Sequence, residues 1–242
     1  MTVSRYKKVE YRQGELVVRI PDTRGVTVAP YGLGNLKIGP DVLTYSKLPG
    51  RPTPHGGSCP GASPECLTIC YAFRIRSSPL VWGMYEENTR RGNTLPPLPE
   101  EARIVRIHVS GDFDTREYIA AWWMMAQAHK DVRFFGYTRS WRVPELLADL
   151  ELLRAMPNVN LLASMDKSIP ELPPEGWRRA WLRDDPRIST LHGPESLGSA
   201  LGPGYELVPA YLCPEETGRK ANCQECRYCI DGKRGDVVFL VH

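Results

Sequence analysis

Residues 103–115 read RIVRIHVSGDFDT and set out the unit from which the fold is expected to be built. The run Arg103–Val109 is short and mostly apolar, as in a strand buried in a sheet, and the turn Ser110–Phe113 ends it. A helical pattern follows to about His129, with Thr115 as its expected N-cap. This stretch predicts one strand–loop–helix unit.

The same pattern continues along the chain. Val132–Tyr137 is a second strand run before a helix from Pro144 to Ala155, and Val159–Ala163 is a third strand run. Successive units of this kind predict a parallel sheet with right-handed crossovers, and such sheets bind ligands at the carboxyl ends of their strands. Three polar loops are therefore expected at that edge: Ser110–Asp112, Thr138–Arg139 and Ser164–Asp166.

The flanking sequence completes the predicted fold class, which is α/β with a partial, open (β/α) barrel. The barrel core is expected over residues 1–204, and a four-cysteine segment with a closing strand over 205–242. Outside the central units we expect strands at Glu15–Arg19, Val42–Tyr45, Tyr205–Ala210 and Val237–Val241, a Gly/Pro-rich loop over 46–64, and helical pieces from Cys66 to about Arg91.

The composition is that of an ordinary globular protein. Of 242 residues, 42% are hydrophobic and 24% charged, which is enough apolar material to exclude a disordered chain. No apolar run approaches the roughly 20 residues needed to cross a bilayer, and no signal peptide is visible, so we expect a cytoplasmic protein without membrane contact. A net charge of +3 is too small by itself to indicate nucleic-acid binding.

Seven cysteines form two clusters, and in a cytosolic protein this favours metal or redox chemistry over disulfides. The second cluster reads Cys213-x9-Cys223-x2-Cys226-x2-Cys229. Zinc sites usually use two separate Cys-x2-Cys pairs, whereas ferredoxins use the run Cys-x2-Cys-x2-Cys. Four thiolates here suit a [4Fe-4S] cluster, with zinc as the alternative metal.

The first cluster reads Cys59-x6-Cys66-x3-Cys70, on a loop entering a helix. Three thiolates can hold three irons of a [4Fe-4S] cluster and leave the fourth open, and an open metal position is what a catalytic site needs. His55 is a possible fourth ligand that would close the site. A zinc site of three cysteines and one histidine is the alternative.

A cysteine triad ahead of a helix, a strand and a Gly-acidic turn resembles the radical S-adenosylmethionine enzymes. The resemblance implies that an open iron on Cys59, Cys66 and Cys70 binds S-adenosylmethionine. It also implies that Ser110–Gly111–Asp112 holds its amine, and that Ser164 and Asp166 contact the ribose or the substrate. The spacing here is longer than the usual Cys-x3-Cys-x2-Cys of that superfamily.

A narrower resemblance covers most of the chain. The segments that carry it look like the phage-associated gene product 88-like family, and they imply its fold but no particular activity. They are 43–50, Ser58–Pro60, Cys70–Ala72, His108–Phe113, Gly136–Trp141, Cys223–Cys229 and 238–242.

Three charged residues at the predicted edge are candidate catalytic groups: Asp112, Arg139 and Asp166. Arg139 has the geometry to pair with a carboxylate or phosphate. The plainer interpretations are helix capping by Asp114 or Thr115 at the turn that contains Asp112, a surface arginine for Arg139 and a turn residue for Asp166. His108, inside a strand, is expected to be a hydrogen-bonded core residue rather than a base.

Two functions remain open from the sequence. The first is a radical enzyme with an auxiliary cluster, an electron donor and an unknown substrate. The second is a non-catalytic iron–sulfur or zinc protein of phage or mobile-element origin that binds nucleic acid. The basic and aromatic stretch Trp177–Arg183 is expected to be a helix, which either stacks on and neutralises a nucleic acid or is simply solvated.

Overall fold

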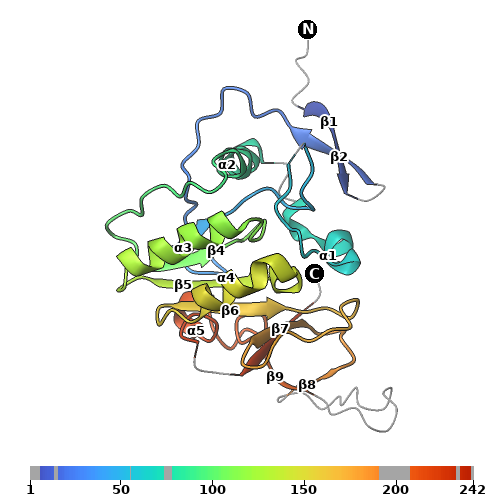
Figure 1. Ribbon diagram of the computed structural model, residues 1–242, viewed down its shortest axis with the longest axis vertical. Coiled ribbons are helices and arrows are strands. Elements are labelled where there is room, and N and C mark those ends of the chain that lie inside the picture. The colour runs from blue at the N-terminus through green and yellow to red at the C-terminus, as the bar shows by residue number, and fades with distance from the viewer. Residues whose placement is uncertain are drawn as a thin grey trace.

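The computed structural model describes residues 6–13, 16–54, 56–73, 78–190, 208–232 and 235–240. Within these ranges, eight parallel strands form one sheet, in the order β3-β4-β5-β6-β7-β10-β9-β8 (Figure 1). The strands are β3 (Val42–Tyr45), β4 (Ile104–Ile107), β5 (Arg133–Thr138), β6 (Val159–Ser164), β7 (Arg178–Leu182), β8 (Ile188–Thr190), β9 (Val208–Leu212) and β10 (Asp236–Phe239).

The sheet is open, because β3 and β8 are edge strands that do not pair with each other. The predicted α/β class with a parallel sheet is confirmed, and the likeness to a partial barrel stays a prediction. Strands from both predicted segments, 1–204 and 205–242, share this sheet, since β10 inserts between β7 and β9.

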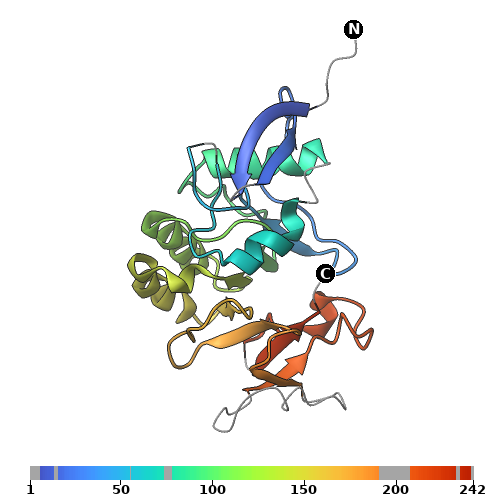
Figure 2. The same cartoon turned by 90° about the vertical axis from the view of Figure 1, so that its right-hand side faces the viewer.

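Two helices, α3 (Arg116–Ala128) and α4 (Pro144–Arg154), cover one face of the sheet (Figures 1 and 2). Alternate strand residues such as Val105 and Phe134 point into the core between them. The predicted start of α3 is confirmed, because the Thr115 hydroxyl accepts a hydrogen bond from the Tyr118 amide at 3.2 Å. Proline opens α4 at its first position, where its missing amide hydrogen costs nothing.

The cysteine-rich segment near the C-terminus covers the opposite face. There Phe135 and Leu162 pack with Cys229 and its neighbours, and the short helix α5 (Cys223–Cys226) lies behind the sheet in Figure 1. The Cys223 amide donates to the Lys37 carbonyl at 2.9 Å, and Asn160 of β6 donates to the Cys229 carbonyl. The segment is thereby attached to the sheet by both apolar packing and hydrogen bonds.

The remaining elements are an antiparallel strand pair, two helices and a 3₁₀ turn. The antiparallel pair β1 (Tyr6–Gln13) and β2 (Leu16–Pro21) lies beside α2 (Pro79–Arg90) in both views. The predicted helical stretch from Cys66 to Arg91 is two helices, since α1 (Pro64–Ile69) ends at Cys70. A 3₁₀ turn, η2 (Ser140–Arg142), precedes α4. Among the described residues, no helix is long and apolar enough to span a bilayer.

The predicted helix at Trp177–Arg183 is wrong, because this stretch contains the central strand β7. Trp177 and Trp181 are 5% and 0% exposed, and they are packed in the core with α4. Asp236 of β10 accepts hydrogen bonds from the Arg179 amide and guanidinium and from the Trp181 indole. This stretch therefore contains a strand, its tryptophans are buried, and Asp236 of the neighbouring strand binds Arg179.

Replacing that carboxylate tests this account of β7. Asp236→Ala removes the partner of a largely buried guanidinium and an indole, so we expect the free energy of unfolding to fall by about 2–3 kcal/mol. Urea denaturation gives the value. Asp149→Ala, which removes the partner of the exposed Arg116, is the control and should change little. Equal effects of the two substitutions would contradict the assignment.

Candidate functional site

The loops at the carboxyl ends of β4, β5 and β6 are joined by hydrogen bonds. The Asp112 carboxylate accepts from the Thr138 hydroxyl at 2.6 Å and from the Arg139 amide at 2.8 Å. The Arg139 guanidinium donates through Nη2 to the Asp166 carboxylate at 3.1 Å. The three candidate catalytic residues are thus brought together at one edge, as the strand–loop–helix pattern predicted.

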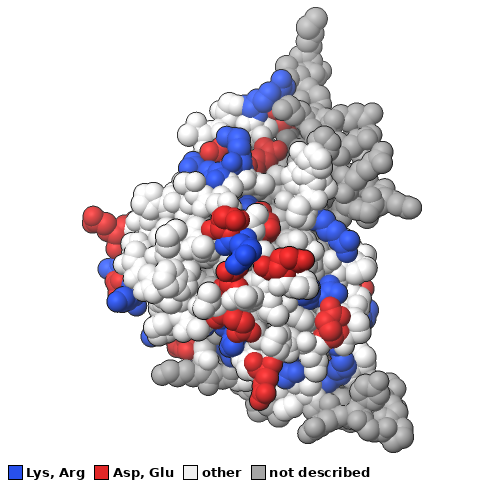
Figure 3. Space-filling model, viewed as in Figure 1, with Lys and Arg blue, Asp and Glu red and all other residues white. Residues whose placement is uncertain are grey.

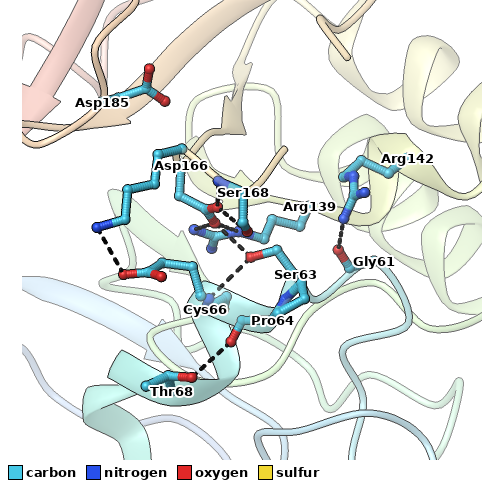
Figure 4. Close-up of polar contacts among 12 residues, drawn as sticks. Gly61, Ser63, Pro64, Cys66, Thr68, Arg139, Arg142, Asp166, Ser168 and Asp185 are labelled. Atoms are coloured by element: carbon cyan, nitrogen blue, oxygen red, sulfur yellow. Dashed lines mark hydrogen bonds and ion pairs between the residues drawn. The ribbon is translucent and has the colours of Figure 1, made fainter. Parts of the chain in front are cut away.

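The first cysteine cluster is attached to this network through Ser63 (Figure 4). The Ser63 hydroxyl donates to Asp166 Oδ2 at 2.6 Å and accepts from the Cys66 amide at 3.0 Å, where it caps α1. Ser63 and Asp166 are both buried, and they are 103 residues apart in the sequence. The cap of α1 therefore also fixes the Cys66 backbone beside the Arg139–Asp166 pair.

The backbone of the loop that carries Cys59 packs directly against the backbone of Arg139. A Cβ on Gly61 would lie 2.1 Å from the Arg139 carbonyl oxygen, so only glycine allows this approach. The Gly61 carbonyl accepts from Arg142 at 3.2 Å, and the neighbouring Ala62 carbonyl accepts from Arg51 at 3.0 Å. These contacts hold the cysteine loop on the carboxyl edge of the sheet.

The three cysteines of the first cluster affect one another's ionisation. Burial raises the pKa of the Cys59 thiol well above its ordinary value, and the negative charges of Asp112, Cys66 and Cys70 add to the effect. Burial also raises the pKa of Cys70 to about 11, with a further contribution from Cys66. Thiols so placed ionise readily only when a cation offsets their charge, which is what a thiolate-binding metal centre supplies.

The carboxylates beside them differ in ionisation. Burial raises the pKa of Asp112 to about 6, although the bonds from Thr138 and the Arg139 amide oppose this. Burial also acts to raise the pKa of Asp166, but hydrogen bonds from Ser168 and Ser63, and the charge of Arg139, outweigh it and lower the pKa. Asp166 is thus the anion of the site, and Asp112 is the carboxyl group with the raised pKa.

The turn after β4 has the features expected of a ligand-binding turn. Gly111 has φ +84°, and a Cβ there would lie 2.5 Å from the Ser58 hydroxyl, so glycine is required. Ser110 is 4% exposed, and its hydroxyl has no hydrogen-bond partner within the described part of the chain. Ser164, the other candidate cofactor contact, is the last residue of β6 and is partly buried.

His108 is buried, as expected, but it follows β4 instead of lying inside the strand, and its backbone adopts φ +63°. Its Nε2 lies 2.9 Å from the Tyr118 hydroxyl, and burial together with the charge of Lys47 lowers its pKa well below the ordinary value. Sequence reasoning missed Lys47, a buried lysine whose ammonium contacts Asp114 at 2.5 Å. It also missed Ser63, which the Ser-Pro pair at the start of a helix could have indicated.

The second cysteine cluster lines one pocket on the other face of the sheet. The hollow measures about 310 Å³ including its open mouth, and Cys213, Cys223, Cys226 and Cys229 all contribute to its wall. The other lining side chains are mainly aromatic or aliphatic: Tyr137, Pro214, Tyr228, Ile230, Val237 and Phe239, with Glu215 as the acidic one. Burial raises the pKa of Cys213 to about 11 and that of Cys229 to about 12.

Within the described ranges, no three His, Cys, Asp or Glu side chains are placed to hold a single metal ion. His55, the possible fourth ligand of the first cluster, lies outside the described residues.

Residues 96–232 match the sequence family described as Gene product 88. The chain belongs to the gene product 88 family. The family match extends from just before β4 through α5 and includes all four cysteines of the second cluster, whereas Cys59, Cys66 and Cys70 precede it. The predicted resemblance to the gene product 88-like family is thereby confirmed.

Curated relatives come from two mycobacteriophages. The Gene 88 protein of Mycobacterium phage L5 is 26% identical over 218 residues, which cover 78% of this chain and 84% of the phage protein. The Gene 88 protein of Mycobacterium phage D29 is 26% identical over 220 residues, covering 78% and 85%. No solved structure matches this gene product 88 family protein.

The close approach at Gly61 predicts how the cysteine loop responds to an added methyl group. Gly61→Ala should force the loop away from Arg139 and lower the free energy of unfolding by about 1–3 kcal/mol, the usual cost of overpacking. Urea denaturation measures the loss. Gly235→Ala is the control, because no atom lies within 4 Å of its added Cβ. An undiminished stability of Gly61→Ala would mean that the loop is not held on the sheet edge.

Proposed function

We propose that this protein is an iron–sulfur enzyme that cleaves S-adenosylmethionine reductively. The observation that carries the proposal is the position of the cysteine triad. Cys59, Cys66 and Cys70 lie on a loop and helix fixed at the carboxyl edge of a parallel sheet, beside the Arg139–Asp166 pair. Ligand sites of parallel sheets occur at this edge.

Three cysteines are the number of protein ligands that a [4Fe-4S] cluster with one open iron requires. The three cysteines would hold three irons of a [4Fe-4S] cluster, and their own mutual repulsion is relieved when they are bound. Held by Cys59, Cys66 and Cys70, such a cluster would supply the electron for reductive cleavage of S-adenosylmethionine, the radical chemistry that would act on a substrate. The cofactor thus supplies the reactivity, and the protein supplies orientation and exclusion of water.

The chain's own residues have separate tasks at this edge. The buried Ser110 hydroxyl, which lacks a partner within the described residues, is available to the amine of S-adenosylmethionine. Asp166 holds the Arg139 guanidinium in place, and the positive charge of Arg139 lies near the Cys66 sulfur and favours its ionised form. Asp112 orients both the Thr138 hydroxyl and the Arg139 backbone.

The four-cysteine pocket would hold an auxiliary [4Fe-4S] cluster. Four cysteine ligands leave no open iron, so this second centre does not bind substrate directly. An external electron donor is needed for turnover, and its identity is open.

The alternative function, nucleic-acid binding, depended on an exposed basic and aromatic surface at Trp177–Arg183. Trp177 and Trp181 are buried and cannot stack on bases, and Arg179 is held by Asp236. On the face shown in Figure 3, acidic and basic side chains are interspersed rather than gathered by sign. These observations favour the enzyme over a nucleic-acid-binding protein.

Metal analysis tests the clusters. Anaerobically purified protein should contain about eight irons and as many sulfides per chain, and either Cys59/Cys66/Cys70→Ser or Cys213/Cys223/Cys226/Cys229→Ser should remove about four. Folding of each variant is checked by circular dichroism. Zinc without sulfide would overturn the proposal and leave a zinc protein.

Binding of S-adenosylmethionine tests the open site. In the iron-loaded protein, Ser110→Ala should weaken binding about fivefold, which corresponds to one hydrogen bond of about 1 kcal/mol. Equilibrium dialysis measures the affinity, and Ser78→Ala, at the start of α2, is the control. If the loaded wild-type protein does not bind S-adenosylmethionine, the radical chemistry is excluded.

A further inference from the structure

Arg106, in the middle of β4, faces the four-cysteine pocket. Its neighbours Val105 and Ile107 pack in the core on the α3 side, so alternation along the strand turns Arg106 to the other face. Its guanidinium carbon lies 5.3 Å from the centre of the Tyr137 ring. Tyr137 is part of the pocket wall, and it packs beside Cys223 and Cys229.

Within the described part of the chain, the positive charge of Arg106 has no carboxylate partner. None of the ion pairs among the described residues includes it, and its Nε is buried without a hydrogen-bond acceptor. Burial acts to lower the pKa of Arg106, but the phenols of Tyr71 and Tyr137 outweigh it and raise the pKa, with further contributions from Cys223 and Cys229. A guanidinium in such a place costs free energy unless a negative charge nearby offsets it.

A second arginine has a similar position across the pocket. The Arg178 guanidinium carbon lies 5.4 Å from the centre of the Tyr228 ring, another part of the wall, and its Nη1 is buried without a partner. Its other nitrogens bind the carbonyls of Tyr228 and Gly235. The acidic wall residue, Glu215, lies 3.6 Å from Lys37, which it shares with the closer Glu216 at 2.9 Å. Among the described residues, Arg106 and Arg178 are thus the two cations beside the pocket that no carboxylate contacts.

We propose that Arg106 is the counter-charge of an anionic, thiolate-ligated metal centre in the four-cysteine pocket. The inference rests on the proposed function in that it assumes a metal there. Four thiolates outnumber the positive charges of an oxidised [4Fe-4S] core and of Zn²⁺ alike, so either centre is anionic. Arg106 acts through the cysteines and is a positioning residue. Its positive charge offsets the net negative charge that the four thiolates give to the bound metal centre.

Metal affinity and stability measured on the same variants test this role. The background is the full chain with Cys59, Cys66 and Cys70 changed to Ser, so that only the four-cysteine centre loads. Arg106→Met removes the charge, Arg106→Lys keeps it, and Arg103→Met is the control. Arg103 directly precedes the same strand, and its guanidinium donates to the carbonyls of Glu100 and Ala102. Each protein is loaded once with iron and sulfide and once with Zn²⁺ alone, and the metal is then titrated with a chelator.

We expect Arg106→Met to weaken metal binding about tenfold or more, with Arg106→Lys and Arg103→Met close to the background. The metal-free Arg106→Met protein should melt no lower than its background, because a buried charge without a partner has been removed. Unchanged metal affinity would overturn the inference, and so would an equal loss of melting temperature with and without metal, which would indicate a packing role. Zinc uptake without iron uptake, together with the tenfold loss, would support Arg106 while overturning the iron–sulfur proposal.

Discussion

The site depends on the buried pair between Arg139 and Asp166. Asp166 follows β6 and Arg139 follows β5, so their contact at 3.1 Å joins two strand ends, and Asp112 extends the connection to β4 through the Arg139 amide. Ser63 uses the same carboxylate to dock α1. A buried charge is stable only when it is fully hydrogen-bonded, and Asp166 accepts from Ser63, Ser168 and Arg139. The cysteine triad reaches the sheet edge through this one anion.

The two cysteine clusters occupy different parts of the sheet for a simple geometric reason. Residues that follow the strands lie together at the carboxyl edge. Cys59 and Cys66 are there close enough to Asp112 and Arg139 for these charges to shift the pKa values of the thiols. The four-cysteine pocket instead lies against a face and receives side chains from within strands, Tyr137 and Val237 among them. Because strand residues alternate between faces, the helices α3 and α4 and the four-cysteine pocket use opposite sides of the same strands.

Much of the central fold and of the site was predictable from local patterns. The strand Val42–Tyr45, the N-cap Thr115 and the proline start of α4 follow from short-range propensity and capping chemistry, and the structure has each where the sequence places it. The meeting of Asp112, Arg139 and Asp166 also followed, because parallel strands end at a common edge. Whether His55 joins the first cluster lies outside the described residues.

The sequence by itself determined the strand–loop–helix units, the two cysteine groups and the sheet edge where the polar loops meet, since these depend on residues close together in the chain. Only the tertiary structure decided that Trp177–Arg183 contains a strand, because Asp236, more than 50 residues later, binds Arg179 and Trp181. It alone paired Ser63 with Asp166, and it placed Arg106 beside the second cluster with no carboxylate partner among the residues that the structure describes. Local propensity cannot specify such contacts, because their free energy comes from burial and charge shared between distant segments.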